Sequence, residues 1–157
     1  MILHVIRQSN QVTIKRWRLD PAGDLIETDP PASLPAREVV ALQPYGSPFF
    51  AAAPVLNACL PAVTEDSRSA VVILRLRGRT ELGTTIMDVL ARYARSLTAT
   101  GSKLVIVSAN QRIQEQLRVT GVTGLIGPGN IYTGDERIGA TLKRAYADAE
   151  KWIEKTS

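Results

Sequence analysis

The clearest pattern of hydrophobic and polar positions lies between Val71 and Leu97. Val71 to Leu76 opens with an unbroken apolar run, which is typical of a strand covered on both faces. Gly78 to Gly83 predicts a tight turn, and a helix is expected to begin at Thr84-Thr85. Its apolar residues recur at spacings of three and four and form one stripe: Ile86, Val89, Leu90, Tyr93 and Leu97.

The alternation of strand and helix continues after Gly101, which we expect to end this helix. Lys103 to Val107 predicts a second buried strand, parallel to the first through a right-handed crossover. Asn110 is expected to cap a helix that ends at Gly121. The glycine-rich run that follows, Gly124 to Gly129, matches neither the P-loop motif nor the dinucleotide-binding motif. It predicts turns around a short strand at Leu125-Ile126, with no phosphate-binding role.

The last segment predicts a long amphipathic helix. Thr133 to Glu136 is typical of a capping box at its start. The expected buried residues are Ile138, Leu142, Ala145, Ala149 and Trp152, and the expected exposed ones are Lys143, Arg144, Glu150, Lys151 and Glu154. Such a helix usually covers a core, although its outer face could also dock a partner.

The first third of the chain is less regular. Gln11 to Leu19 predicts a strand, and its imperfect alternation indicates an edge position or a bulge. Asp20 to Ala36 is proline-rich and predicts a surface loop with a short strand at Leu25-Ile26. Glu38 to Leu42 predicts a strand stopped by Pro44 and Gly46. A short helix is expected to carry Pro54 in its first turn and to reach about Leu60.

Residues 1–10 have two interpretations. An apolar stretch that passes at once to Arg7 is typical of the end of a transmembrane helix on its cytoplasmic side, and it is equally typical of a short first strand. Residues 11–157 are expected to form a single domain. The resulting fold class is α/β, with a mixed, mostly parallel sheet of about four to six strands and helices packed against it.

Composition excludes several classes of function. Of the 157 residues, 45% are apolar and 22% charged, as in ordinary globular domains. Cys59 is the single cysteine, so we expect a packed core thiol and no cysteine-based zinc site. His4 is the single histidine, so histidine-paired nucleophilic catalysis is excluded in its usual form. We expect no enzyme activity, no metal and no cofactor, apart from a weak affinity for nucleotides.

Net charge does not choose a partner. A charge of +4 fits an anionic membrane surface or a nucleic acid, but the value is modest. Two Trp and two Phe offer few stacking platforms, and no nucleic-acid-binding motif is present. Nucleic acid is therefore not an expected partner.

Thr84 and Thr85 carry the main candidate chemistry. The first amides of a helix lack partners and its dipole favours negative charge, so this position can hold a phosphate, free, nucleotide-borne or attached to a hydroxyl. The two threonines could also simply cap the helix. Arg75, Arg77 and Arg79 stand nearby and could contact an anion, a nucleotide phosphate or an anionic lipid, or could be a solvated strand end.

Three stretches resemble the STAS domain, and in particular the cytoplasmic C-terminal domain of SulP-family anion (sulfate) permeases. Tyr45 to Ala53 is similar to the permeases' Gly-x-Leu-Phe-Phe-Ala-x-Ala stretch. Val71 to Leu90 is similar to the family's strand, Asp-Ser-Ser/Thr-Gly loop and helix. Gly101 to Ile131 repeats its strand, helix and Ile-Gly-x-x-x-Ile ending. The resemblance covers about Glu38 to Trp152.

One departure bears on the site. In stand-alone STAS proteins that antagonise anti-sigma factors, the Asp-Ser-Ser-Gly loop holds the phosphorylated Ser. The matching positions here are Gly83, Thr84, Thr85 and Ile86, so the family's Asp and Gly are missing. Thr85 occupies the phosphoacceptor position and can accept phosphate chemically, but the elements that a kinase would recognise are incomplete.

The resemblance implies a non-catalytic regulatory domain on the cytoplasmic side of the cell membrane, soluble when isolated. Its expected partners are the membrane domain of a parent transporter and a regulatory protein or nucleotide, with a homodimer formed through that transporter. The Gly83 to Thr85 loop would be the interaction surface. The alternatives are a stand-alone phospho-regulated switch and a small nucleotide-binding module.

Overall fold

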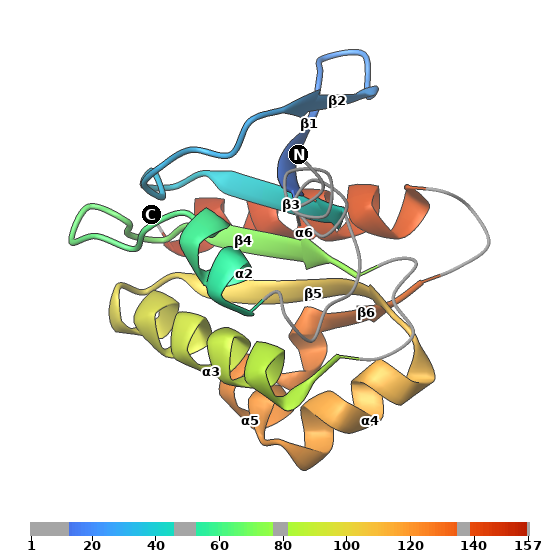
Figure 1. Cartoon of the computed structure of the whole chain (residues 1–157). Coiled ribbons are helices and arrows are strands. Elements are labelled where there is room, and N and C mark those ends of the chain that lie inside the picture. Colours follow the sequence, from blue (N-terminus) through green and yellow to red (C-terminus); the bar gives the residue numbers. More distant parts are fainter. Residues whose placement is uncertain (1–12, 46–52, 77–81, 135–138, 157) are drawn as a thin grey trace, which may run out of the picture.

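A computed structural model describes residues 13–45, 53–76, 82–134 and 139–156. Within these ranges one sheet has the strand order β2-β1-β3-β4-β5-β6, with helices on both faces (Figure 1). The strands are β1 (Thr13–Leu19), β2 (Leu25–Thr28), β3 (Val39–Tyr45), β4 (Val71–Arg75), β5 (Lys103–Ala109) and β6 (Ile131–Thr133). The helices are α2 (Ala53–Cys59), α3 (Thr84–Ala99), α4 (Gln111–Val119), α5 (Val122–Ile126) and α6 (Ala140–Thr156), with a 3-10 turn η2 (Pro128–Asn130).

The pairing of the strands confirms the expected mixed sheet. β3, β4, β5 and β6 run parallel to one another, whereas β1 is antiparallel to both β2 and β3. β4 lies between two parallel neighbours, and each of its residues is buried. This explains why its sequence is an unbroken apolar run rather than an alternation.

Alternate residues of β4 enter two separate cores. Val72 and Leu74 pack with the buried stripe of α3, and this core also takes residues from α2, α4 and α5. Val71 and Ile73 pack on the other face against α6, through Leu142, Ala145 and Ala149. The predicted buried residues of both helices are thus confirmed within the described part of the chain, except that Tyr93 and Trp152 are only partly buried. Cys59 packs against the first core as a free thiol.

The helix ends follow local rules. Gly101 has φ +76°, and its N–H donates to the Thr98 carbonyl (3.1 Å) while Ser102 N–H donates to Leu97 (2.9 Å). This is the Schellman arrangement, which needs a left-handed residue after the helix. Asn110 caps α4 as predicted, because its Oδ1 accepts the Ile113 N–H at 2.8 Å.

Two expectations for the first strands are wrong. β1 is not the outermost strand and is not bulged in its described pairing, because β2 continues through Thr28 and pairs with Arg16 to Leu19 on its outer side. Within the described residues, Thr13 to Lys15 pair with β3 alone. β3 does not stop at Pro44 but runs to Tyr45. Its pairing with β4 ends at Leu42, so Pro44 pairs only with β1 and its missing N–H removes no bond to β4. The strand at Leu25-Ile26 is confirmed.

The region after Gly121 differs most from expectation. Leu125-Ile126 is the end of helix α5, not a strand. Gly121 has φ +85° and starts α5, and Val122 and Ile126, four residues apart, both enter the core. Packing of this i, i+4 pair overrides the β-propensity of the segment. The sheet instead gains β6 after η2.

The last helix begins later than predicted. Thr133 belongs to β6 and its Oγ1 accepts a hydrogen bond from Gln114 Nε2 (3.1 Å), so it does not cap α6, which starts at Ala140. Asp135, Glu136 and Ile138 lie outside the described residues, as do residues 1–10. Among the residues that the structure describes, no helix is both long and apolar enough to span a membrane.

Candidate functional site

The candidate residues lie at one end of the parallel strands. The carboxyl ends of β4 and β5 are neighbours, and α3 and α4 begin just beyond them (Figure 1). Leu76 N–H donates to the Val107 carbonyl at 2.9 Å, so the two strands stay together to this edge. Open α/β sheets bind ligands and partners outside the carboxyl ends of their strands.

The start of α3 differs from a threonine-capped helix. Gly83 is the N-cap, in an extended conformation, and no side chain caps the helix. Thr84 and Thr85 occupy the first turn, and both are exposed. The interpretation of these threonines as caps is therefore wrong, because each stands one or two positions too late. Their hydroxyls face solvent at the dipole's positive end.

A glutamine on α4 holds the segment that enters α3. Gln116 Nε2 donates to the Leu82 carbonyl (3.0 Å), and its Oε1 accepts the Leu82 N–H (2.9 Å). The Leu82 side chain itself is buried, with 3% exposed. This pair of bonds joins the middle of α4 to the segment before α3 across 34 residues of sequence, and it fixes the approach to Gly83. The sequence contained no signal for it, because a glutamine within a polar helix is usually solvated.

Of the three candidate arginines, the structure describes only Arg75, and it does not lie beside the threonines. Arg77 and Arg79 lie outside the described residues. Arg75 continues the alternation of Val71 and Ile73, so it lies on the α6 face of the sheet, opposite α3. It is buried, with 6% exposed, and its Nη1 donates to Gln43 Oε1 at 2.6 Å. A solvated strand end is therefore excluded for Arg75.

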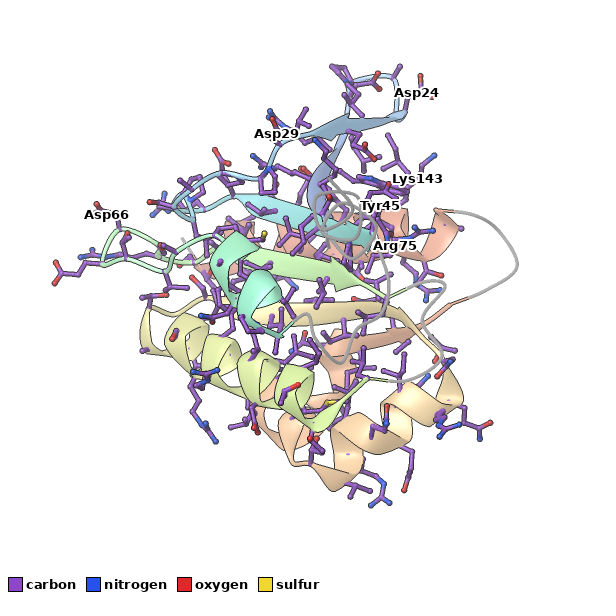
Figure 2. The ribbon with its side chains drawn as sticks, in the orientation of Figure 1. Asp24, Asp29, Tyr45, Asp66, Arg75 and Lys143 are labelled. Carbon is purple, nitrogen blue, oxygen red and sulfur yellow. The ribbon has the colours of Figure 1, made fainter. Side chains whose placement is uncertain are left out.

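Arg75 belongs to an aromatic and acidic cluster at the end of β3. Its guanidinium lies 4.7 Å from the centroid of the Trp17 ring, and Tyr45 lies close by (Figure 2). Glu27 Oε2 accepts hydrogen bonds from Tyr45 Oη (2.7 Å) and Trp17 Nε1 (3.0 Å). These bonds lower the pKa of Glu27, while burial and the bond to Glu27 raise the pKa of Tyr45.

A groove extends the candidate surface along α3. Its cavity of about 520 Å³ lies between α3 and α5 and is lined by Asp88, Ala91, Arg92, Arg95, Thr120, Gly121 and Leu125. Thr85, Asp88, Arg92 and Arg95 follow one another at spacings of three and four, so they form one exposed stripe. Leu125 is 39% exposed and supplies an apolar wall. Sequence reasoning missed this groove because it assigned Leu125 to a strand.

Comparison with known families identifies the family to which the chain belongs. The family model of the STAS domain matches residues 35–145. This range contains strands β3 to β6 and includes the start of α3. The chain belongs to the STAS domain family. The match includes Gly83, Thr84 and Thr85, whereas β1 and β2 lie before its first residue. No curated protein sequence matches the chain.

Solved STAS structures agree with this assignment. The STAS domain of a SulP transporter from Vibrio cholerae is 27% identical, with a TM-score of 0.56 over 78% of this chain and 88% of that one. A proposed anti-sigma factor antagonist from Thermotoga maritima is 16% identical (TM-score 0.51, 74% of this chain and 93% of that one). The murine anion transporter Slc26a9 is 14% identical (TM-score 0.61), with 93% of this chain aligned to 24% of that one. The last two show the fold alone.

Proposed function

We propose that this STAS domain is a non-catalytic regulatory module of a SulP-like anion transporter, on the cytoplasmic side of the membrane. The observation that carries the proposal is the match to a SulP transporter STAS domain at 27% identity over most of both chains. The membrane domain of the parent transporter is the first partner, and a homodimer would form through that transporter. The transported anion would bind in the membrane domain.

The proposed interaction surface is the start of α3 together with the groove between α3 and α5. Exposed hydroxyls at Thr84 and Thr85 lie at one end of the stripe, and Arg92 and Arg95 lie further along it. Such a surface suits an acidic protein segment or an anionic ligand. Arg77 and Arg79, which precede it in the chain, remain candidates for contacts with the same anion.

The mechanism is coupling between docked states. A regulator changes transport only if it binds the two docked states of the domain with different affinity. A negative charge at Thr85 would repel an acidic partner segment from one state and thereby shift the balance between the two.

Two measurements test the proposal. The reading frame upstream of Met1 is expected to encode ten or more hydrophobic segments. In the full transporter, Thr85→Glu is expected to change anion uptake severalfold at equal surface expression, whereas Thr156→Glu on α6 leaves uptake unchanged. An upstream frame without hydrophobic segments, or equal uptake in the two variants, contradicts the proposal.

A phospho-regulated switch is the second candidate, because Thr84 and Thr85 expose their hydroxyls at a helix start, where a phosphate is stabilised. It predicts that a cognate kinase labels one of the two threonines and that Thr85→Ala abolishes or halves the label. Incubation without labelling, together with a hydrophobic upstream frame, eliminates it. Titration with GTP and ATP separates a nucleotide-binding module, which requires amide shifts at Leu82 to Thr85.

A further inference from the structure

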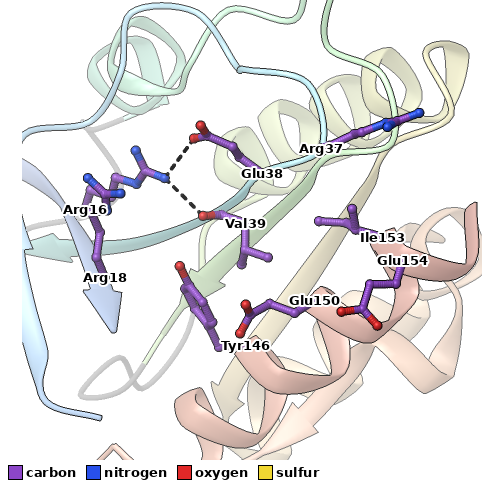
Figure 3. A pocket seen from close by; sticks show the side chains of 9 residues that line it. All are labelled: Arg16, Arg18, Arg37, Glu38, Val39, Tyr146, Glu150, Ile153 and Glu154. Carbon is purple, nitrogen blue, oxygen red and sulfur yellow. Dashed lines mark hydrogen bonds and ion pairs between the residues drawn. The ribbon is translucent and has the colours of Figure 1, made fainter. Parts of the chain in front are cut away.

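A second cavity lies at the opposite, amino-terminal end of the parallel strands, away from α3. Its volume is about 360 Å³, and it is lined by Arg16, Arg18, Arg37, Glu38, Val39, Tyr146, Glu150, Ile153 and Glu154. Figure 3 shows that β1, residues 37–39 at the start of β3, and α6 from Tyr146 onward supply these side chains. The lining holds three arginines and three glutamates, so its formal charge is zero.

Arg16 is the buried cation of this cavity. It is 8% exposed, and its Nη2 donates to Glu38 Oε2 (3.2 Å) and to the Val39 carbonyl (3.1 Å). Its Nε is buried and has no hydrogen-bond partner among the described residues. A buried donor of a charged group that lacks a partner is costly, and a ligand carboxylate that binds the same guanidinium from the cavity would offset part of that cost. The exposed Arg18 lies beside it (Figure 3).

The other wall is a face of α6. Tyr146, Glu150, Ile153 and Glu154 recur at one-turn spacings and line the cavity together. Glu150 and Glu154 are like charges four residues apart on this face. Figure 3 shows Arg16 and Arg18 on one side of Tyr146 and Glu150 on the other.

Charged groups on both walls of the cavity act on the pKa of the Tyr146 phenol. Burial raises its pKa most, and Glu150 raises it further, while Arg16 and Arg18 act in the opposite direction and Glu38 adds a smaller increase. Charges of both signs therefore lie close enough to act on one group between them.

We propose that this cavity binds a small zwitterion of amino-acid or dipeptide size. Its carboxylate pairs with Arg18 and with the guanidinium of Arg16, and its ammonium group pairs with Glu150. A simple anion would meet three glutamates here and a simple cation three arginines, whereas a zwitterion satisfies both walls. Val39 and Ile153 provide apolar contact for the carbon skeleton. The site is separate from the α3 surface, so it stands whether or not the regulatory proposal holds.

The experiment is an amide NMR titration of the whole chain with each of the twenty L-amino acids and with glycylglycine. At least one of these ligands is expected to give saturable shifts at Arg16, Val39 and Tyr146. Its N-acetyl and carboxamide derivatives, which each lack one charge, are expected to bind at least tenfold more weakly. Absence of saturation for all of them, or equal binding of the blocked derivatives, overturns the proposal.

Variants locate the site. Arg18→Ala and Glu150→Gln alter exposed side chains, so the fold should survive, and each is expected to weaken binding at least fivefold. Lys151→Gln changes a neighbouring exposed residue of α6 that does not line the cavity, and it should bind as the unaltered chain does. Equal affinity in all three variants would place the ligand elsewhere and refute the proposal.

Discussion

At the scale of single residues, the most informative groups are polar side chains that bond to backbone across long sequence separations. Gln116 holds both polar atoms of Leu82, and Tyr93 Oη on α3 donates to the Pro61 carbonyl at 2.6 Å. Each of these bonds holds a backbone group that lies outside the helices and strands. Their loss should therefore be measurable in stability.

Gln116→Ala removes both bonds to Leu82 and leaves two part-buried backbone groups without these partners. We expect a loss of about 1 to 3 kcal/mol in the free energy of unfolding, measured by urea denaturation. Glu115→Ala is the matched control on the same helix, because Glu115 pairs only with the exposed Arg118. That surface pair is worth about 0 to 1 kcal/mol. Equal losses in the two variants would show that the Gln116 bonds do not stabilise the approach to α3.

Tyr93 gives an alkaline dependence of stability. Burial raises the pKa of its phenol, so the unfolded chain ionises first, from the ordinary tyrosine pKa of about 10. Its contribution is complete below that pH and is lost as the pH rises toward the folded pKa. Tyr93→Phe is expected to cost about 0.5 to 1.5 kcal/mol at pH 7 and to lessen the alkaline decline.

The readout is the denaturation midpoint measured between pH 8 and pH 11. Part of the decline should remain in Tyr93→Phe, because burial and a bond to Asp148 also raise the pKa of Tyr132 to about 12. A variant whose midpoint follows the same pH curve as the unaltered protein would show that Tyr93 does not contribute.

At the scale of elements, α5 decides the shape of the proposed interaction surface. Its Leu125 lines the groove beside α3, and Val122 and Ile126 anchor the helix in the core. Without this helix, Leu125 would not stand opposite Arg92 and Asp88. The groove thus depends on a short element whose sequence, rich in Gly and β-branched residues, has little helix propensity.

Gly124→Ala tests whether this segment is helical. Gly124 lies inside α5 without a positive φ, and a Cβ added there meets nothing within 4 Å. We expect stabilisation by about 0.5 to 1 kcal/mol, since alanine is favoured over glycine within a helix. Gly121→Ala is the contrasting control, because φ +85° makes any side chain there destabilising. Thermal unfolding should move the two midpoints in opposite directions; a destabilised Gly124→Ala would contradict the helix.

At the scale of the whole molecule, the sheet separates two surfaces of different character. The carboxyl ends of the parallel strands carry the starts of α3 and α4, and their amino ends carry the cavity beside Arg16 and α6. β4 connects them and contributes to both cores.

The central strand should dominate stability. Ile73 on β4 is fully buried, whereas Ile26 on the outer strand β2 is 45% exposed. Ile73→Ala is expected to cost about 2 to 5 kcal/mol because it leaves a cavity in the α6 core. Ile26→Ala should change the free energy of unfolding by less than about 0.5 kcal/mol. Similar urea midpoints for the two variants would contradict the expectation that the central strand dominates stability.

The local pattern of the sequence determined the parallel core of this protein. The apolar run of β4, the stripe on α3, and the Asn110 cap each depend on residues a few positions apart, so they could be predicted from the chain alone. The candidate position at Thr84 and Thr85 followed from the same strand-to-helix transition. The resemblance to STAS domains rested on these segments too.

Tertiary structure decided what depends on distant residues. Leu125-Ile126 became a helix because Val122 and Ile126 fill one core, and Thr133 joined β6 because β5 offered an edge for pairing. The burial of Arg75 depends on Trp17 and Gln43 from other strands. Short-range propensities of about 1 kcal/mol are smaller than the energy of burying such groups, so packing prevails where the two disagree.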